Sequence, residues 1–160
     1  MKKIFLIFAL VFFSANSAKA TEINDYPTLK IITFDGKNFD LKEKRRKVII
    51  VNFWAKWCGY CRKEMPVLDQ LYKKYKASGL EIIGVSVDRK RSYDTAKNFA
   101  AQFSYPNSSF YDIKETSFDE PIAIPMSYII DKEGKIRAVL QGDDEESGAK
   151  RFEDLLKPLL

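Results

Sequence analysis

The sequence predicts one α/β domain whose sheet contains a parallel pair of strands, and three observations indicate this class. Hydrophobic residues make up 46% of the 160 residues, which suffices for one packed core. Two continuous apolar runs, residues 47–53 and 80–87, are typical of strands buried on both faces of a sheet. A helical pattern lies between them, and this order implies a right-handed crossover between parallel strands.

The first predicted helix covers residues 59–77 and ends at Ser78-Gly79. Its apolar side chains recur at spacings of three and four residues: Met65, Leu68, Leu71, Tyr72 and Tyr75. After the second apolar run, residues 92–103 show the same helical pattern. Residues 107–112 then favour a short strand.

The C-terminal part predicts a hairpin followed by a helix. Residues 126–130 and 135–141 have strand patterns, and Asp131-Lys132-Glu133-Gly134 between them is typical of a hairpin turn. The last helix starts near the acidic run 143–146, whose charge suits a helix N-terminus. We expect this helix to bury four apolar side chains: Phe152, Leu155, Leu156 and Leu159.

Residues 1–20 have the pattern of a signal peptide. A basic start and an apolar run, residues 4–13, precede Ala18-Lys19-Ala20, which offers the small residues of a cleavage site. The run is much shorter than the about 20 residues of a membrane-spanning helix. We therefore expect cleavage after this motif, a mature domain of residues 21–160, and a periplasmic or otherwise exported protein. An uncleaved membrane anchor is the alternative.

The mature domain carries little net charge. Three lysines leave with the signal peptide, so 24 of the 27 basic residues remain against 22 acidic ones, a net charge of +2. Such a small excess gives no reason to expect nucleic-acid binding. The basic run at residues 42–47 is interpreted as a solvated loop.

The numbers of cysteine and histidine residues limit which catalytic groups and metal sites the chain can have. A sequence without histidine has no Ser–His or Cys–His nucleophile pair and no metal site built on imidazole. Exported proteins with two cysteines usually hold one disulfide. Cys58 and Cys61 are so close in sequence that their bond would close almost no loop and add little stability. Metal binding or redox chemistry therefore remains as the role of this cysteine pair.

The Cys58-Gly59-Tyr60-Cys61 motif lies where the first apolar strand meets the first helix. A thiol at a helix N-terminus faces unpaired N–H groups, which stabilise its thiolate. We therefore expect Cys58 to attack a substrate disulfide and Cys61 to resolve the mixed disulfide. A zinc site lacks further Cys or His ligands, and haem attachment would need histidine where Arg62 stands. A Cu(I) site on two thiolates stays open.

Three segments carry a family resemblance: VNFWAKWCGYCRKEMP (residues 51–66), IIGVSVD (82–88) and IPMSYIIDKEGKI (124–136). They resemble the thioredoxin superfamily, and more narrowly the exported TlpA/ResA-like thiol-disulfide reductases. The likeness covers roughly residues 30–160. It implies a thioredoxin-like fold, with a central mixed β-sheet flanked by helices and with an inserted strand and helix before a cis-proline. Residues 88–119 are long enough to hold that insertion.

The resemblance also assigns substrate-binding residues. It implies that Pro125 is the cis-proline beside the disulfide, and that Ile124 before it pairs with the substrate backbone like an added strand. Without the resemblance, an ordinary trans bond would be expected at this position. Trp57 is implied to flank Cys58 in an apolar docking surface. The alternative for any Trp is a core aromatic residue.

Two positions depart from thioredoxin itself. Asn52 stands where thioredoxin has a buried aspartate, and an amide cannot take up a proton. The TlpA/ResA-like proteins use a glutamate three residues after the second cysteine, and Glu64 occupies that place. We expect burial to raise its pKa, so that it deprotonates Cys61; a solvent-facing Glu is the alternative. Tyr60, where thioredoxin has proline, also resembles exported disulfide isomerases and leaves the redox direction open.

We therefore expect an exported thiol-disulfide oxidoreductase of the reductase type, without a metal or cofactor of its own. The resemblance implies protein disulfides as substrates, an apocytochrome c as a client in cytochrome c maturation, and a membrane electron donor. We expect a monomer, because the chain has no room for the dimerisation domain of exported isomerases. A disulfide oxidase or isomerase and a non-enzymatic Cu(I) carrier are the alternatives.

Overall fold

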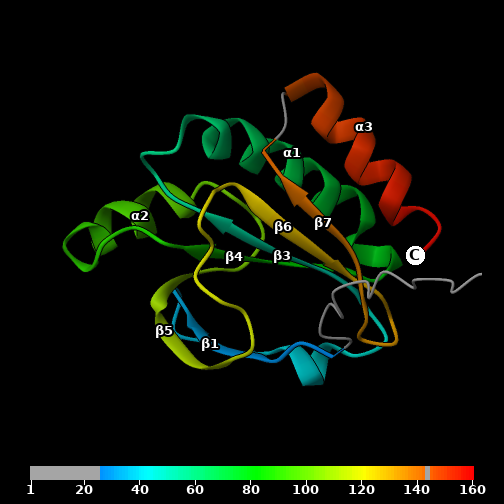
Figure 1. Cartoon of the computed structure of the whole chain (residues 1–160), viewed down its shortest axis with the longest axis horizontal. Coiled ribbons are helices and arrows are strands. Elements are labelled where there is room, and N and C mark those ends of the chain that lie inside the picture. The colour runs from blue at the N-terminus through cyan, green and yellow to red at the C-terminus, as the bar shows by residue number, and fades with distance from the viewer. Residues whose placement is uncertain (1–25, 143–144) are drawn as a thin grey trace, which may run out of the picture.

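The computed structural model describes residues 26–142 and 145–160, which form a mixed seven-stranded sheet with helices packed on it (Figure 1). The order across the sheet is β2-β1-β5-β4-β3-β6-β7. The strands are β1 (Leu29–Thr33), β2 (Asn38–Asp40), β3 (Val48–Trp54), β4 (Leu80–Ser86), β5 (Asn107–Thr116), β6 (Met126–Ile130) and β7 (Ile136–Gln141). The helices are α1 (Gly59–Tyr75), α2 (Tyr93–Ala100) and α3 (Glu145–Leu156), with 3-10 turns η1 (Leu41–Lys44), η2 (Lys76–Ser78) and η3 (Lys90–Ser92).

Strand β3 has a neighbour on each side, β4 in parallel and β6 in antiparallel orientation. All seven residues of β3 and all seven of β4 are buried, as their continuous apolar sequences predict. The parallel pairing across α1 confirms the predicted crossover. Strands β6 and β7 pair in antiparallel orientation, which confirms the hairpin.

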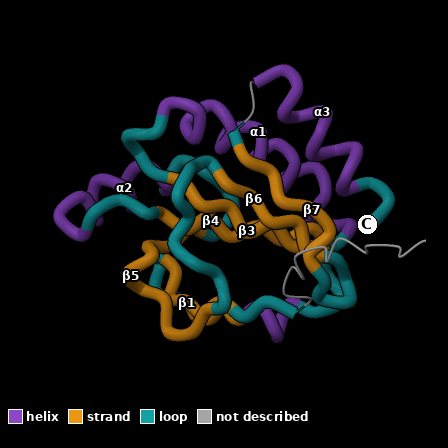
Figure 2. The backbone as a smooth tube through the Cα atoms, in the orientation of Figure 1, coloured by secondary structure: helices purple, strands orange, loops and turns teal. Residues whose placement is uncertain are grey.

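The two faces of the sheet are covered by different elements. On one face, alternate side chains of β3 such as Val48 and Ile50 pack with residues of α1, α2 and α3. Figure 1 and Figure 2 show α1 and α3 side by side on this face. On the other face, Ile49 and Phe53 pack with β1, β2 and Phe118. The two-residue period of a strand therefore divides the core into two layers.

The structure adds two strands that the sequence patterns did not predict, β1 and β2. They pair with each other, and β1 also pairs with β5, so their partners lie far away in the sequence. Strand β5 is longer than the predicted strand and runs to Thr116. Helix α2 and strand β5 occupy the stretch between β4 and Pro125, which confirms the expected inserted helix and strand.

The predicted signal peptide, residues 1–20, lies outside the described residues, as does the start of the acidic run at residues 143–144. In the remainder of the chain, we find no helix with both the length and the apolarity that crossing a bilayer requires. The prediction for the C-terminal helix is confirmed in part: Phe152 and Leu156 are buried and Leu155 is partly buried, whereas Leu159 lies beyond the end of α3 and is partly buried against the same core.

Candidate active site

The fold brings two loops together at one end of the sheet. The cysteine motif follows the last residue of β3, and Pro125 precedes the first residue of β6. Because β3 and β6 are antiparallel neighbours, the end of one strand lies beside the start of the other, with Phe53 opposite Met126. The cysteine loop and the Pro125 loop therefore meet, although they are more than 60 residues apart in sequence.

Cys58 is the N-cap residue of α1 and forms a disulfide with Cys61 in the first turn of that helix. The backbone N–H of Cys61 donates a hydrogen bond to Cys58 Sγ at 3.1 Å. Cys58 is 6% exposed, whereas Cys61 is completely buried. Of the two sulfur-bearing residues, only Cys58 thus reaches the surface, and its sulfur faces the N–H groups of the helix end.

The peptide bond between Ile124 and Pro125 is cis, as the resemblance implied. The carbonyl oxygen of Ile124 lies 3.7 Å from Cys58 Sγ. Pro125 is buried and Ile124 is half-buried, so the carbonyl before the cis bond borders the disulfide directly.

Glu64 takes part in a hydrogen-bonded cluster behind the cysteines. Asn52 Nδ2 donates to Glu64 Oε1 at 2.8 Å and to Ser127 Oγ at 2.9 Å. Ser127 Oγ donates to the same Glu64 oxygen at 3.3 Å. Asn52 and Ser127 are fully buried and stand opposite each other on β3 and β6, while Glu64 is half-buried. Glu64 Oε1 is therefore hydrogen-bonded to buried side chains, although the residue is partly exposed, and sequence reasoning missed Ser127.

Exposed apolar side chains are found in the cysteine loop, at the start of α1 and in the segment before Pro125. Trp57 is 70% exposed and Tyr60 is 61% exposed. Ile122, in the segment before Pro125, is fully exposed and was not predicted from the sequence. Trp54, by contrast, is buried and packs on Phe99. The core-aromatic alternative thus applies to Trp54 but not to Trp57.

A buried carboxylate joins the two loops that follow β3 and β4. Asp88 Oδ2 accepts hydrogen bonds from the backbone N–H of Lys56 at 2.8 Å and from Ser86 Oγ at 2.9 Å. The N–H of Val87 donates to the carbonyl oxygen of Trp54 at 2.8 Å. Sequence reasoning missed Asp88; a lone acid directly after an apolar strand is the signal that marks it.

The comparison with protein families decides the assignment. The model of the AhpC/TSA family matches residues 23–139, which is most of the chain. This chain belongs to the AhpC/TSA family. It is also similar to a thiol-disulfide oxidoreductase ResA of Bacillus cereus, at 30% identity over 148 residues, 91% of this chain and 84% of that protein. ResA of Bacillus subtilis (strain 168) is 28% identical over 146 residues, 90% and 80% of the two chains.

Solved structures show the fold of the chain by similarity. The thiol:disulfide interchange protein of the thioredoxin family from Chlorobium tepidum TLS superposes with a TM-score of 0.69 at 26% identity, over 84% of this chain and 94% of that one. The secreted thiol-disulfide isomerase from Corynebacterium glutamicum has a TM-score of 0.63 at 23% identity, over 84% and 83% of the two chains, and shows the shared fold. The thioredoxin-like fold is confirmed. With the Cys58–Cys61 disulfide, the chain is a thiol-disulfide oxidoreductase.

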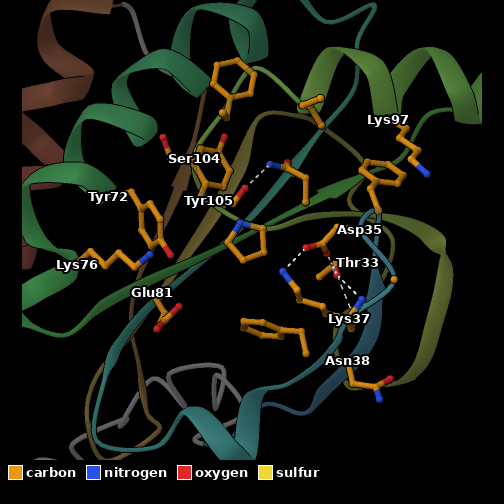
Figure 3. A pocket seen from close by; sticks show the side chains of 18 of the residues that line it. Thr33, Asp35, Lys37, Asn38, Tyr72, Lys76, Glu81, Lys97, Ser104 and Tyr105 are labelled. Carbon is orange, nitrogen blue, oxygen red and sulfur yellow. Dashed lines mark hydrogen bonds and ion pairs between the residues drawn. The ribbon is translucent and has the colours of Figure 1, made fainter.

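A cavity of about 920 Å³ lies away from the cysteines of this AhpC/TSA family protein. It opens between the β1–β2 turn, the end of α1 and the segment before β5, and Figure 3 shows Asp35 and Lys37 pointing toward one another at its wall. Hydrogen bonds from Lys37 and Thr33 hold the pKa of Asp35 below its ordinary value. The cavity lining contains none of the predicted site residues.

Two further observations concern ionisable groups. Burial, followed by the charges of Glu64 and Asp69, raises the pKa of Tyr105 well above its ordinary value. Its hydroxyl has no hydrogen-bond partner among the described residues.

No group of three or more His, Cys, Asp or Glu side chains within residues 26–142 and 145–160 is arranged to hold a metal ion.

Proposed function

We propose that this oxidoreductase is an exported reductase that passes two electrons from the Cys58 and Cys61 thiols to disulfides of client proteins. The observation that carries the proposal is the environment of Cys58 Sγ. This sulfur caps α1, is bonded to a buried partner and lies 3.7 Å from the carbonyl oxygen of Ile124. A reactive sulfur with one exposed side and one internal partner suits thiol–disulfide exchange.

The reaction consists of two exchanges. The Cys58 thiolate attacks one client sulfur, so that a bond between Cys58 and the client forms, the client disulfide breaks, and the other client sulfur leaves as a thiolate. The Cys61 thiolate then attacks Cys58 Sγ, which forms the Cys58–Cys61 disulfide and releases the first client sulfur. The client gains two electrons and takes up two protons, and the dithiol loses both.

The position of Cys58 at the N-terminus of α1 supports its role as the nucleophile. The Cys61 N–H points at Cys58 Sγ, and the positive end of the α1 dipole favours a negative charge there. The lower exposure of Cys61 supports its role as the resolving cysteine, since an external disulfide reaches Cys58 first. Steric access for a bulky client therefore selects one sulfur for attack.

Glu64 is proposed as the base that deprotonates Cys61. It follows Cys61 by three residues on α1, so both side chains lie on one face of the helix. Its hydrogen bonds with Asn52 and Ser127 turn the carboxylate toward the interior, where Cys61 is buried. A carboxylate held there is positioned to accept a proton away from bulk solvent.

The docking surface is proposed to include Trp57, Ile124 and Pro125. The exposed ring of Trp57 offers apolar area beside the attacking sulfur. The Ile124 carbonyl offers a backbone acceptor, which lets a client segment add to this edge as an extended strand. Backbone pairing suits an enzyme that acts on more than one client sequence.

The cellular setting is also part of the proposal. We infer export by residues 1–20, a monomeric domain, a membrane electron donor that re-reduces the disulfide, and an apocytochrome c as client. The names of the ResA relatives support disulfide exchange, and the oxidising character of compartments outside the cytoplasm requires a dedicated donor for a reductase.

The reduction potential tests the direction of electron flow. We expect a value of about −250 mV or lower in glutathione or dithiothreitol buffers, together with reduction of insulin disulfides. A value near about −120 mV would identify an oxidant and overturn the proposal. Tight Cu(I) binding without insulin reduction would favour a copper carrier. Capture of clients by the Cys61→Ala variant in the native host, followed by mass spectrometry, tests the apocytochrome c assignment.

A further inference from the structure

Two backbone groups of opposite polarity face Cys58 Sγ. The N–H of Cys61 donates to this sulfur at 3.1 Å, and the carbonyl oxygen of Ile124 lies 3.7 Å from it. An N–H group stabilises a thiolate, whereas a carbonyl oxygen accepts a hydrogen bond from a thiol and disfavours a thiolate. The charge state of Cys58 in the reduced protein therefore depends on the balance between these two contacts.

The carbonyl oxygen of Ile124 is available to an incoming chain. Within residues 26–142 and 145–160, no backbone N–H donates to it, whereas the carbonyl of Pro125 accepts from the N–H of Gly142 at 3.1 Å. Ile122 and Ala123, just before it, are exposed, and Ile124 itself is half-buried. Because backbone carbonyls normally find a donor when they are covered, a client N–H is a suitable partner for this oxygen.

Charged side chains of both signs belong to the segments around Cys58. The N–H of Lys56 bonds to the buried Asp88, and Glu64 bonds to Asn52. The other titratable groups of these segments are Tyr60, Arg62, Lys63, Asp119, Glu120 and the acidic run 143–146, which follows Gly142 in sequence. A client segment without charged residues adds no charge to this set. Its backbone, however, competes directly for the Ile124 carbonyl.

We propose that client docking activates Cys58: a backbone N–H of the client occupies the Ile124 carbonyl oxygen and frees the Cys58 thiol to ionise. This inference rests on the proposed function and adds a control step before the first exchange. In the free reduced protein the thiol donates its hydrogen atom to this oxygen, which favours the neutral form.

The replacement of the thiol by the client N–H changes only one hydrogen bond at the sulfur. The thiol proton passes to solvent, and the thiolate keeps the hydrogen bond from the Cys61 N–H. Docking also removes water from the sulfur, which by itself raises the pKa of a thiol. The proposal therefore requires that the released carbonyl contact outweighs this loss of water.

The Cys61→Ala variant isolates the first exchange, because it has a single thiol and retains the backbone N–H at position 61. An uncharged, end-capped peptide carries one cysteine as a mixed disulfide with 2-mercaptoethanol. The small reagent bis(2-hydroxyethyl) disulfide has the same leaving group and no backbone N–H. Formation of the mixed disulfide with Cys58 is measured by acid quenching and mass spectrometry from about pH 5 to about pH 10, a range that includes ordinary thiol pKa values.

The two pH profiles report two states of Cys58. With the small disulfide, the midpoint of the profile reports the thiol in the free protein, and at saturating peptide it reports the docked complex. We expect the midpoint of the docked complex to be about one pH unit lower. The matched control is the same peptide with N-methyl groups on its cysteine and on both flanking residues. It covers the sulfur but lacks the N–H donors, so its midpoint should not fall below that of the small disulfide.

The outcomes separate the two proposals. A midpoint for the docked peptide at or above that of the small disulfide would contradict the inference, and so would a decrease that the N-methylated peptide reproduces. A rate that rises with peptide concentration without saturating would show that no docked complex forms, which also overturns it. In each case the reductase function stands if the reduced wild-type protein reduces insulin. If Cys58 reacts with neither disulfide and wild type leaves insulin oxidised, the proposed function itself fails.

Discussion

The amide of Asn52 donates a hydrogen bond to Glu64 Oε1 at 2.8 Å, which connects the central strand to the helix that carries both cysteines. Ser127 on β6 donates to the same oxygen, so two neighbouring strands hold the carboxylate of a residue on α1. Glu64 is thereby fixed on the side of α1 that faces the interior. Its carboxylate oxygen Oε1 is therefore part of a hydrogen-bonded cluster with Asn52 and Ser127.

Replacing Glu64 by Gln should raise the pH at which Cys61 reacts. The amide keeps the size of the side chain but cannot accept a proton from the thiol. The measurement is the pH profile of resolution, taken from the decay of a preformed mixed disulfide between Cys58 and a reporter thiol. Glu133→Gln, at an exposed turn position, is the matched control. An identical profile for Glu64→Gln and wild type would remove Glu64 from the proposed mechanism.

The two cysteines should give opposite phenotypes when each is replaced by Ala. Cys58→Ala should abolish insulin reduction, because the buried Cys61 cannot reach an external disulfide. Cys61→Ala should accumulate mixed disulfides, which are visible as reducible bands on a non-reducing gel. The double variant serves as the control without any trapped partner. Equal trapping by both single variants would contradict the assignment of nucleophile and resolving cysteine.

Gly84→Ala should destabilise the domain. A Cβ atom at Gly84 would overlap Asn107 Oδ1 and lie 3.0 Å from Trp54 Nε1. The Asn107 amide is itself held by a hydrogen bond to the carbonyl of Tyr105 at 3.0 Å, so it cannot retreat freely. Overpacking of a core typically costs about 1–3 kcal/mol, and urea unfolding would measure it.

The control for this change is Gly59→Ala. An added Cβ at Gly59 meets nothing within 4 Å, and the residue begins α1, where Ala is favourable. Its unfolding midpoint should equal or exceed that of wild type. Equal unfolding midpoints for Gly84→Ala and wild type would show that β4 and β5 can move apart around the added Cβ atom without loss of stability.

Protonation of Glu153 should lower stability in acid. Hydrogen bonds from Lys74, Lys157 and Tyr75 lower the pKa of Glu153 from 4.5 to about 2. A carboxyl whose pKa is depressed by folding stabilises the native state above its unfolded pKa, and this contribution disappears as the pH falls from about 4.5 to about 2. The difference in unfolding free energy between wild type and Glu153→Gln should therefore be larger at about pH 6 than at about pH 2.5.

Glu120→Gln, in the exposed segment before Pro125, provides the comparison for this pH dependence. Its difference from wild type should stay nearly constant over the same pH range. A constant difference for Glu153→Gln as well would mean that the contacts between α1 and α3 do not stabilise the charged carboxylate in solution.

The central part of the fold was predictable because its signals are local. The apolar runs of β3 and β4 and the periodicity of α1 lie in continuous sequence, and the structure confirms them. Strands β1 and β2 were missed because they are short and depend on pairing with each other and with β5. Their formation depends on contacts between distant segments, which no local pattern reports.

The features of the site also differ in whether local sequence could predict them. The cysteine spacing is visible in the sequence, whereas the cis bond before Pro125 was expected only from the family resemblance. The pairing of Asn52 with Ser127 requires the register of β3 and β6, which joins residues 75 positions apart. The role of Asp88 likewise depends on which loops become neighbours after folding.

The unequal burial of the two sulfurs has a consequence for kinetics. Since Cys61 is buried and only Cys58 is exposed, we expect the proposed electron donor and the proposed client to bind at the same position in turn. We therefore expect no ternary complex of donor, enzyme and client at Cys58. Steady-state rates should give parallel double-reciprocal lines. A large excess of either protein should inhibit turnover, because it competes with the other protein for the same binding position.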